Sequence, residues 1–289
     1  MKEWKDENPW FVFCSFIASH HPFEAPIDQI NRYDERDIPL PEEKGGVEGC
    51  LVPEPARSAI GETKKYSSKI QRRIVHYYFA SISLIDDCVG LLVKTLKDTR
   101  IYDDTLILFT SDHGEFLGNH GLLRKPSIHC DELLKVPLMM KLPGSRCAGT
   151  RIDGLIELVD VYPTLAGFLR IDVNPGVQGI NWADKIGKGE NIGRDEIYAE
   201  MHEVKPIFTS LVGPYTAVVS LRSKQWKLNL YPAAGIEYGQ LFNLQEDPDE
   251  ARNLYADNSF RAVKEERLWR LIRRTHFMAD PVPLWLSQY

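Results

Sequence analysis

The clearest pattern of apolar and polar positions along the chain lies between residues 64 and 98. Apolar side chains recur there at spacings of three and four, which is the period of an amphipathic α-helix. The stretch therefore predicts one long helix with a single buried face. The positions that carry the pattern are Ile70, Ile74, Tyr78, Ile82, Ile85, Val89, Leu92 and Leu96.

Three shorter apolar runs predict buried strands. Residues 10–16 (WFVFCSF) and 106–110 (LILFT) are rich in aromatic and β-branched residues, and the run VPLMMKLPG ends in a Pro-Gly turn. Between the first run and the helix, residues 27–61 are rich in proline, glycine and charge, which predicts a long surface loop. Loops of this length are uncommon in compact domains and are often functional.

The C-terminal third of the chain has a different pattern. Asp160, in LVDVYPTLAGFLRI, is placed to cap a helix that tolerates Pro163 in its first turn, and a glycine-rich stretch then indicates a linker. Short strand-like segments follow at close intervals, and residues 260–275 predict a closing helix. We therefore expect an α/β domain over residues 1–190. Residues 191–289 are expected to form a C-terminal subdomain, a small antiparallel sheet with one helix.

Composition narrows the class of protein. Of the 289 residues, 43% are hydrophobic and 26% are charged, which is ordinary for a folded globular chain. A formal net charge of -6 offers no basic field for nucleic acid, and no apolar run is long enough to predict a membrane span. The five cysteines are scattered without a C-x-x-C pair, so buried, reduced thiols are favoured over a disulfide framework. The compartment stays open among periplasmic, secreted, lysosomal and cytoplasmic.

Chemically active side chains follow two of the predicted strands. His20 and His21 come after the first, and Asp112 and His113 come after the second. Ligands of open α/β sheets bind at the carboxyl ends of strands, so these four residues are candidates for a site. The alternative is that Asp-His-Gly is a plain turn in which Gly114 supplies a positive φ, and that His-His-Pro is a surface loop.

A carboxylate and an imidazole at adjacent positions can bind one divalent cation, but two ligands are too few for a complete site. Asp86 and Asp87 lie in mid-helix, where adjacent side chains point about 100° apart, so a solvated or locally bonded pair is the better interpretation. A cation close to Lys125 and His20 would form a positive pocket. Such a pocket suits an anionic tetrahedral group, because it offsets charge that develops on oxygen when a sulfate or phosphate ester breaks.

Six segments follow one another along the chain: FCSFIASHHPF, SLIDDCVGLLVKTL, DDTLILFTSDHGEFLGNHGLLRK, VPLMMKLPG, ELVDVYPTLAGFL and QLFNLQEDPDEARNL. In this order, over residues 10–254, the chain resembles the sulfatase family of the alkaline phosphatase superfamily. The block TSDHGEFLGNHGL, followed by Lys125, is specific to that resemblance. The fold that it implies is α/β, with an alkaline-phosphatase-like central sheet that is flanked by helices and incomplete. The smaller C-terminal antiparallel sheet and its helix follow.

The resemblance implies a role for each candidate residue. Asp112 and His113 are metal ligands, with calcium as the first choice of ion and magnesium or manganese as alternatives. Lys125 binds the sulfate oxygens. His20 matches the histidine of the family's P-H-x-P-F-like segment, which binds sulfate or protonates the leaving alcohol, and His21 is given secondary weight. Ser19 stands where the family often has proline, and His113 stands where many members have asparagine.

The resemblance also exposes a gap. Sulfatases use a cysteine or serine in a C-x-P-S-R-like motif, converted to formylglycine, as the nucleophile, and a pair of aspartates as further metal ligands. None of the five cysteines here stands in that motif, and the segments that match begin in the middle of the catalytic domain. We therefore expect no turnover from this chain alone. We also expect self-association through a truncated, exposed sheet edge.

Three functions remain in view. The first is a portion of a sulfatase that acts on a small-molecule or glycan sulfate ester. The second is a phosphonate or phosphodiester hydrolase of the same superfamily, which shares the Asp112, His113 and Lys125 positions. The third is a catalytically inactive binding module that keeps the fold.

Overall fold

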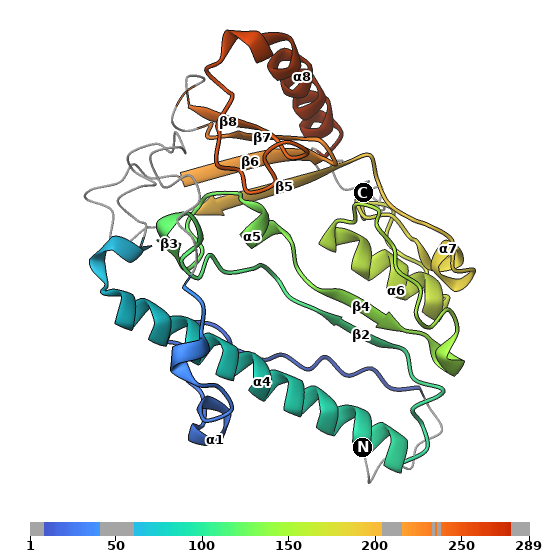
Figure 1. The fold of residues 1–289 in the computed structure, drawn as a ribbon. Coiled ribbons are helices and arrows are strands. Elements are labelled where there is room, and N and C mark those ends of the chain that lie inside the picture. Colours follow the sequence, from blue (N-terminus) through green and yellow to red (C-terminus); the bar gives the residue numbers. More distant parts are fainter. Residues whose placement is uncertain (1–8, 41–60, 204–215, 233–234, 236–237, 279–289) are drawn as a thin grey trace, which may run out of the picture.

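The computed structural model is dominated on one side by a single long helix, α4 (Ser68–Asp98), which confirms the helix predicted from the apolar spacing (Figure 1). The Ser67 side chain accepts a hydrogen bond from the Ile70 backbone N–H and so caps the N-terminus of α4. Asp87 is not bonded locally, because its carboxylate pairs with Arg32, 55 residues away beside the short helix α1 (Ile27–Ile30). The structure describes residues 9–40, 61–203, 216–232, 235 and 238–278. Among them no helix is long and apolar enough to cross a bilayer.

Strands β2 (Ile107–Thr110) and β4 (Leu138–Lys141) pair in antiparallel register, with Ile107 opposite Lys141. Both strands were predicted, but the prediction that they are buried is wrong. The residues of β2 are half-buried, and Met139 of β4 is 59% exposed. The physical reason is that the described residues add no third strand to this pair, so most of its surface stays uncovered.

The predicted strand at residues 10–16 is absent from the structure. These residues have no regular secondary structure, and the side chains of Phe11 and Phe13 are 74% and 83% exposed. A strand needs a partner with which to share its backbone hydrogen bonds, and no described residue pairs with this segment. The exposed aromatic side chains are consistent with self-association, which stays a prediction.

The loop after β2 is more ordered than its polar sequence indicates. It contains the two-residue strand β3 (Leu122–Leu123), which pairs with β1 (Gly61–Glu62), and the short helix α5 (Asp131–Leu134). A buried cluster holds the loop together. Its members are Phe116, Leu122, Ile128, Cys130 and Leu133.

Glu115 closes this loop from the inside. Its Oε1 atom accepts hydrogen bonds from the backbone N–H groups of Leu117 and Arg124, residues that lie on either side of β3. Burial raises the pKa of the Glu115 carboxyl, although both hydrogen bonds and the positive charges nearby oppose that rise. Because Lys125 follows Arg124 directly in the sequence, the hydrogen bond between Arg124 and Glu115 also fixes the position of the Lys125 backbone.

Asp160 occupies the predicted N-cap position of α6 (Val161–Leu169), but its side chain does not cap that helix. Instead the carboxylate pairs with Arg194 and accepts hydrogen bonds from the Ile180 backbone N–H and from Trp182 Nε1, at 2.7 and 3.2 Å. The stretch predicted as a linker is therefore folded against α6. It includes helix α7 (Ala183–Gly187).

The C-terminal part is an antiparallel sheet with one covering helix, as predicted (Figure 1). Its strands lie in chain order, and α8 (Arg261–Met278) packs on them. Gly239 is required by a close approach, because a Cβ atom there would lie 2.3 Å from the ring of Tyr255. The boundary at residues 190 and 191 stays a prediction. The strands are β5 (Glu196–Glu203), β6 (Thr216–Ser223), β7 (Trp226–Leu230) and β8 (Gly239–Asn243).

Short 3-10 turns connect the longer elements. They are η1 (Glu35–Asp37), η2 (Thr63–Lys65), η3 (Asn119–Gly121), η4 (Pro143–Ser145), η5 (Leu158–Asp160) and η6 (Asn258–Phe260).

A buried charge network joins this sheet to α5. The Lys227 ammonium on β7 is fully buried, lies 3.0 Å from Asp131 Oδ1 and contacts the Glu250 carboxylate. Arg222 of β6 makes two hydrogen bonds of 2.9 Å to Asp131, and the Asp131 backbone N–H donates to Glu250. Buried charges of this kind are stable only as a complete set, so the network fixes α5 against the sheet.

We expect Lys227→Met to lower the free energy of unfolding by about 3 to 5 kcal/mol, because the buried Glu250 carboxylate would lose its cation. Urea unfolding monitored by tryptophan fluorescence measures the loss. The matched control is Lys224→Met, which changes an exposed lysine between β6 and β7. It should change the free energy of unfolding by less than about 0.5 kcal/mol. Equal stability of the two variants would show that the network does not hold the sheet in place.

We expect Glu115→Ala to destabilise the loop by about 1 to 3 kcal/mol, because two backbone N–H groups lose their acceptor. Hydrogen exchange of the Leu117 and Arg124 amides should accelerate, while exchange in α4 stays unchanged. Glu246→Ala, at an exposed position, serves as the control. Unaltered protection of both amides would contradict the role assigned to Glu115.

Candidate active site

Asp112 and His113 follow the end of β2 after one intervening residue and line an open pocket together with Lys125. The same pocket reaches the C-terminal sheet, where Tyr198 of β5 and Arg222 of β6 form part of its wall. Three of the five residues predicted from the sequence therefore share one cavity, in which the loop after β2 brings Lys125 back to the strand tip.

The His113 imidazole is held in a defined orientation. Its Nδ1 atom lies 2.7 Å from the Gly114 carbonyl oxygen, so Nδ1 carries the proton and donates it. With that tautomer, Nε2 presents a lone pair, and the Lys125 ammonium donates to it at 2.8 Å. The ring thus offers its acceptor nitrogen to the pocket, beside a cation.

The Asp112 carboxylate lies next to the same nitrogen, with Oδ2 at 3.6 Å from His113 Nε2. Its other oxygen accepts a hydrogen bond from the His113 backbone N–H at 3.0 Å. Partial burial alone would raise the pKa of the Asp112 carboxyl, but His113, backbone N–H groups and Lys125 outweigh that effect and lower it. Asp112 is therefore an ionised carboxylate at neutral pH.

These two residues fit a divalent cation. A ligating histidine usually donates its second ring N–H to a carbonyl or carboxylate, as His113 does to Gly114. The Asp112 Oδ2 atom and His113 Nε2 lie 3.6 Å apart, and a cation bound by both would take the Nε2 lone pair that now accepts a hydrogen bond from Lys125. The donor set suits manganese and, through Asp112, the harder calcium and magnesium ions.

Gly114 has a different role from the one that a plain turn would require. Its φ is not in the left-handed region, but a Cβ atom at this position would lie only 1.8 Å from the Glu132 carbonyl oxygen. The Gly114 backbone N–H also donates to the Leu133 carbonyl at 2.9 Å. Only glycine lets the strand tip pack this closely on α5.

His20 and His21 stack on each other, with ring centroids 4.2 Å apart, and His20 Nδ1 lies 2.6 Å from the His21 carbonyl oxygen. Slight burial, followed by the charges of Arg124, His20 and Lys125, lowers the pKa of His21. The charge of Lys125 therefore acts on the His21 ring. In the part of the chain that the structure describes, no hydrogen bond or ion pair joins His20 to Lys125 or His113.

Sequence reasoning missed His129, which also lines the pocket. Its Nδ1 atom lies 2.6 Å from Ser220 Oγ on β6, and burial together with the Lys227 charge lowers the pKa of His129 to about 4. The ring is therefore neutral at physiological pH. No local pattern marks this residue, because its partner is 91 residues away.

The sequence of the chain matches two family profiles and a group of curated relatives. The profile described as Sulfatase matches residues 1–171, and the one described as N-sulphoglucosamine sulphohydrolase, C-terminal, matches residues 118–276. The choline-sulfatase of Rhizobium meliloti (strain 1021) is 30% identical over 295 residues, which cover 94% of this chain and 52% of that protein. The chain spans about half the length of the curated relatives it matches.

Solved structures show the same fold. The phosphonate monoester hydrolase of Silicibacter pomeroyi superposes with a TM-score of 0.81 at 24% identity, over 95% of this chain and 57% of that one. A protein solved with its substrate D-glucosamine-2-N,6-O-disulfate superposes with a TM-score of 0.65 at 21% identity, over 77% of this chain and 45% of that one. With the profile match and the 30% identity, these findings confirm the predicted resemblance: the chain belongs to the sulfatase family.

Proposed function

We propose that this chain forms the metal-binding and leaving-group side of a sulfatase active site, which hydrolyses a sulfate ester. The observation that carries the proposal is the 2.8 Å contact between Lys125 Nζ and His113 Nε2, beside the ionised Asp112 carboxylate. A fixed ammonium next to two metal-binding groups is the arrangement that an anionic tetrahedral group requires.

In this proposal Asp112 and His113 hold the cation, with calcium as the first choice and magnesium or manganese as alternatives. When bound, the cation offsets negative charge on the sulfate oxygens. Lys125 donates hydrogen bonds to the same oxygens, and Glu115 orients it through the loop. The hydrogen bond from Lys125 Nζ to His113 Nε2 places the ammonium group at the wall of the pocket.

His20 is the proposed donor of a proton to the leaving alcohol or a ligand of sulfate, and His21 is its neighbour with a supporting part. His21 stacks on His20, and the lowered pKa of His21 favours its neutral ring, which suits a supporting part better than that of the proton donor. The nucleophile would come from outside the residues described, because no cysteine of the chain stands in a C-x-P-S-R-like motif. Turnover by this chain alone is not expected.

The proposed substrate is a small-molecule or glycan sulfate ester. The name of the choline-sulfatase and the sulfated glucosamine bound to a structural neighbour support both classes. A phosphonate or phosphodiester hydrolase is the second candidate, since phosphonate monoester hydrolases share the fold. A binding module without activity is the third. The experiments below distinguish these alternatives by ligand preference.

The metal assignment predicts that Asp112→Asn weakens binding of calcium and of manganese by at least about tenfold, because a charged ligand is lost. Isothermal titration of the 289-residue chain with each ion measures the affinity. Asp86→Asn, which changes a carboxylate on α4, is the matched control and should bind like the parent. Equal affinities for Asp112→Asn and the parent would refute the metal site.

The substrate assignment predicts that p-nitrophenyl sulfate binds more tightly than p-nitrophenyl phenylphosphonate, an ester with the same single charge. Lys125→Ala should weaken sulfate-ester binding about tenfold, through loss of a charge-assisted hydrogen bond. Lys94→Ala, at an exposed ion pair on α4, should leave binding unchanged. A Lys125-dependent preference for the phosphonate would favour the second candidate. If no ligand binds in a way that depends on Lys125, the third candidate, a binding module without activity, would remain.

A further inference from the structure

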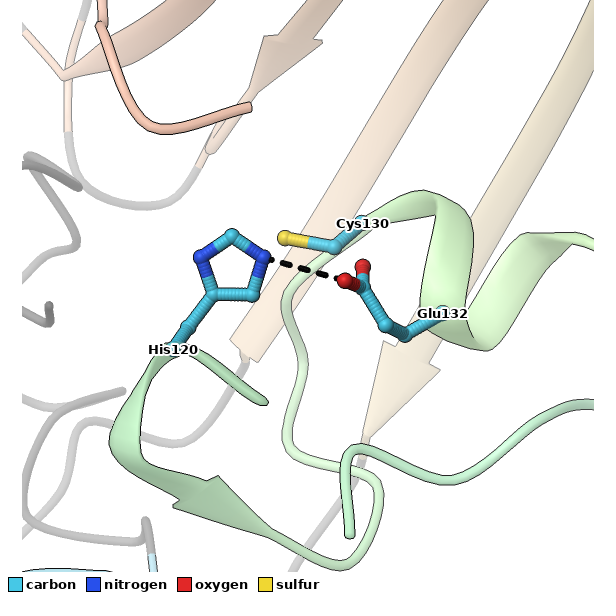
Figure 2. Close-up of side chains that lie close together, drawn as sticks. All are labelled: His120, Cys130 and Glu132. Carbon is cyan, nitrogen blue, oxygen red and sulfur yellow. Dashed lines mark ion pairs between the residues drawn. The ribbon is translucent and has the colours of Figure 1, made fainter. Parts of the chain in front are cut away.

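A second group of side chains of the kinds that bind metals lies where α5 packs against the end of β2. His120, Cys130 and Glu132 each direct one donor atom to a common point, and these atoms all lie within 4.8 Å of one another (Figure 2). His120 Nε2 is 3.3 Å from Glu132 Oε1. His120 and Cys130 are buried, with exposed fractions of 1% and 0%, whereas the Glu132 side chain is 22% exposed.

The backbone conformations at His120 and at the start of α5 bring these three side chains together. His120 adopts a left-handed conformation with φ of 56°, between Gly118 and Gly121, which also have positive φ values. A non-glycine residue in this region costs roughly 1 kcal/mol or more, so the turn is maintained by its surroundings. It directs the imidazole inward toward Cys130, the N-cap residue of α5, and Glu132 in the first turn of that helix (Figure 2).

The spacing and chemistry of the donors match a zinc-type ion. Tetrahedral zinc bonds of about 2.0 to 2.3 Å place neighbouring donor atoms about 3.3 to 3.8 Å apart, and the imidazole and carboxylate already meet that separation. A thiolate ligand disfavours calcium and magnesium and favours zinc. Three protein ligands with one partly exposed side leave room for a water molecule as the fourth.

A His120–Glu132 ion pair is the competing explanation. Burial lowers the pKa of His120, but the Glu132 carboxylate outweighs burial and raises it, so an imidazolium is stable in this place without a metal. In the competing explanation Cys130 is only a packing residue of the buried cluster around Phe116. The two explanations therefore differ in whether a ligand needs the Cys130 sulfur.

We propose that His120, Cys130 and Glu132 bind one zinc ion at a site separate from Asp112 and His113. The ion would connect η3 to α5 and so reinforce the loop that ends at Lys125. Gly114 packs on the Glu132 backbone, so the site lies directly behind the strand tip. The proposal does not depend on the hydrolytic function of the chain.

Titration of the 289-residue chain with cobalt(II), a spectroscopic substitute for zinc, tests the proposal. A thiolate-to-cobalt absorption band is expected in the near ultraviolet, and added zinc should remove it. The band should be absent in Cys130→Ser. It should persist in Asp112→Asn and in Cys147→Ser, which changes an exposed cysteine. Because outer-shell partners alone are worth about 10- to 100-fold in metal affinity, His120→Gln should weaken zinc binding by about 100-fold or more.

Absence of the band from the parent, or its persistence in Cys130→Ser, would overturn the proposal. If circular dichroism shows that Cys130→Ser or His120→Gln does not fold, Glu132→Gln provides the decision, because it keeps the side-chain volume at the most exposed ligand. Competition with a chromophoric chelator should then show zinc binding at least about tenfold weaker than in the parent. Unchanged zinc affinity would refute the site. Loss of the band in Cys147→Ser, with the band retained in Cys130→Ser, would assign the cobalt to the pocket that Cys147 lines and equally refute the site.

Discussion

The buried ammonium of Lys227 is the constraint on which the arrangement of the pocket depends. A charge without access to water requires a complete set of partners, and these come from Asp131 on α5 and from Glu250 beyond β8. The contacts continue from α5 to the pocket: the Gly114 N–H donates to the Leu133 carbonyl, and the Gly114 carbonyl accepts from His113. The C-terminal sheet thereby holds the imidazole of the candidate active site in place.

Near the tip of β2 the pocket combines the positive charge of Lys125 with the exposed Asp112 carboxylate. Arg124 and Lys125 emerge together from the loop that Glu115 closes, and their charges reach as far as His21. Asp112 stays ionised beside them, because opposite charge and backbone N–H groups outweigh the effect of partial burial. Such a mixture suits the joint binding of a cation and a tetrahedral anion, which is the chemistry that members of the sulfatase family require.

The two proposed ion sites differ in the kind of ligand that they offer. Asp112 and His113 present a carboxylate and an imidazole to an open pocket, where hard ions with several oxygen ligands are favoured. Behind them, Cys130 adds a sulfur atom in a buried place, which favours a softer ion and tetrahedral geometry. Position in the fold and donor chemistry therefore favour different metals at the two proposed sites.

The sequence by itself determined the elements whose signals are local. The spacing of apolar residues specified α4, and the short strand-like segments specified the C-terminal sheet with its helix. The block around Asp112 and Lys125 indicated the family and a candidate site. Each of these signals repeats or ends within about thirty residues, so it can be recognised without knowledge of the fold.

Only the tertiary structure decided which side chains meet. Asp160 had the position of a helix cap, but Arg194, distant in sequence, took its carboxylate. Gly114 fitted a turn, yet the approach of Glu132 explains why it is glycine. The apolar run at residues 10–16 predicted a buried strand, but burial requires partners that the described residues do not provide. Contacts across many tens of residues leave no periodic mark in the sequence, because they depend on packing between elements and not on the repeat within one.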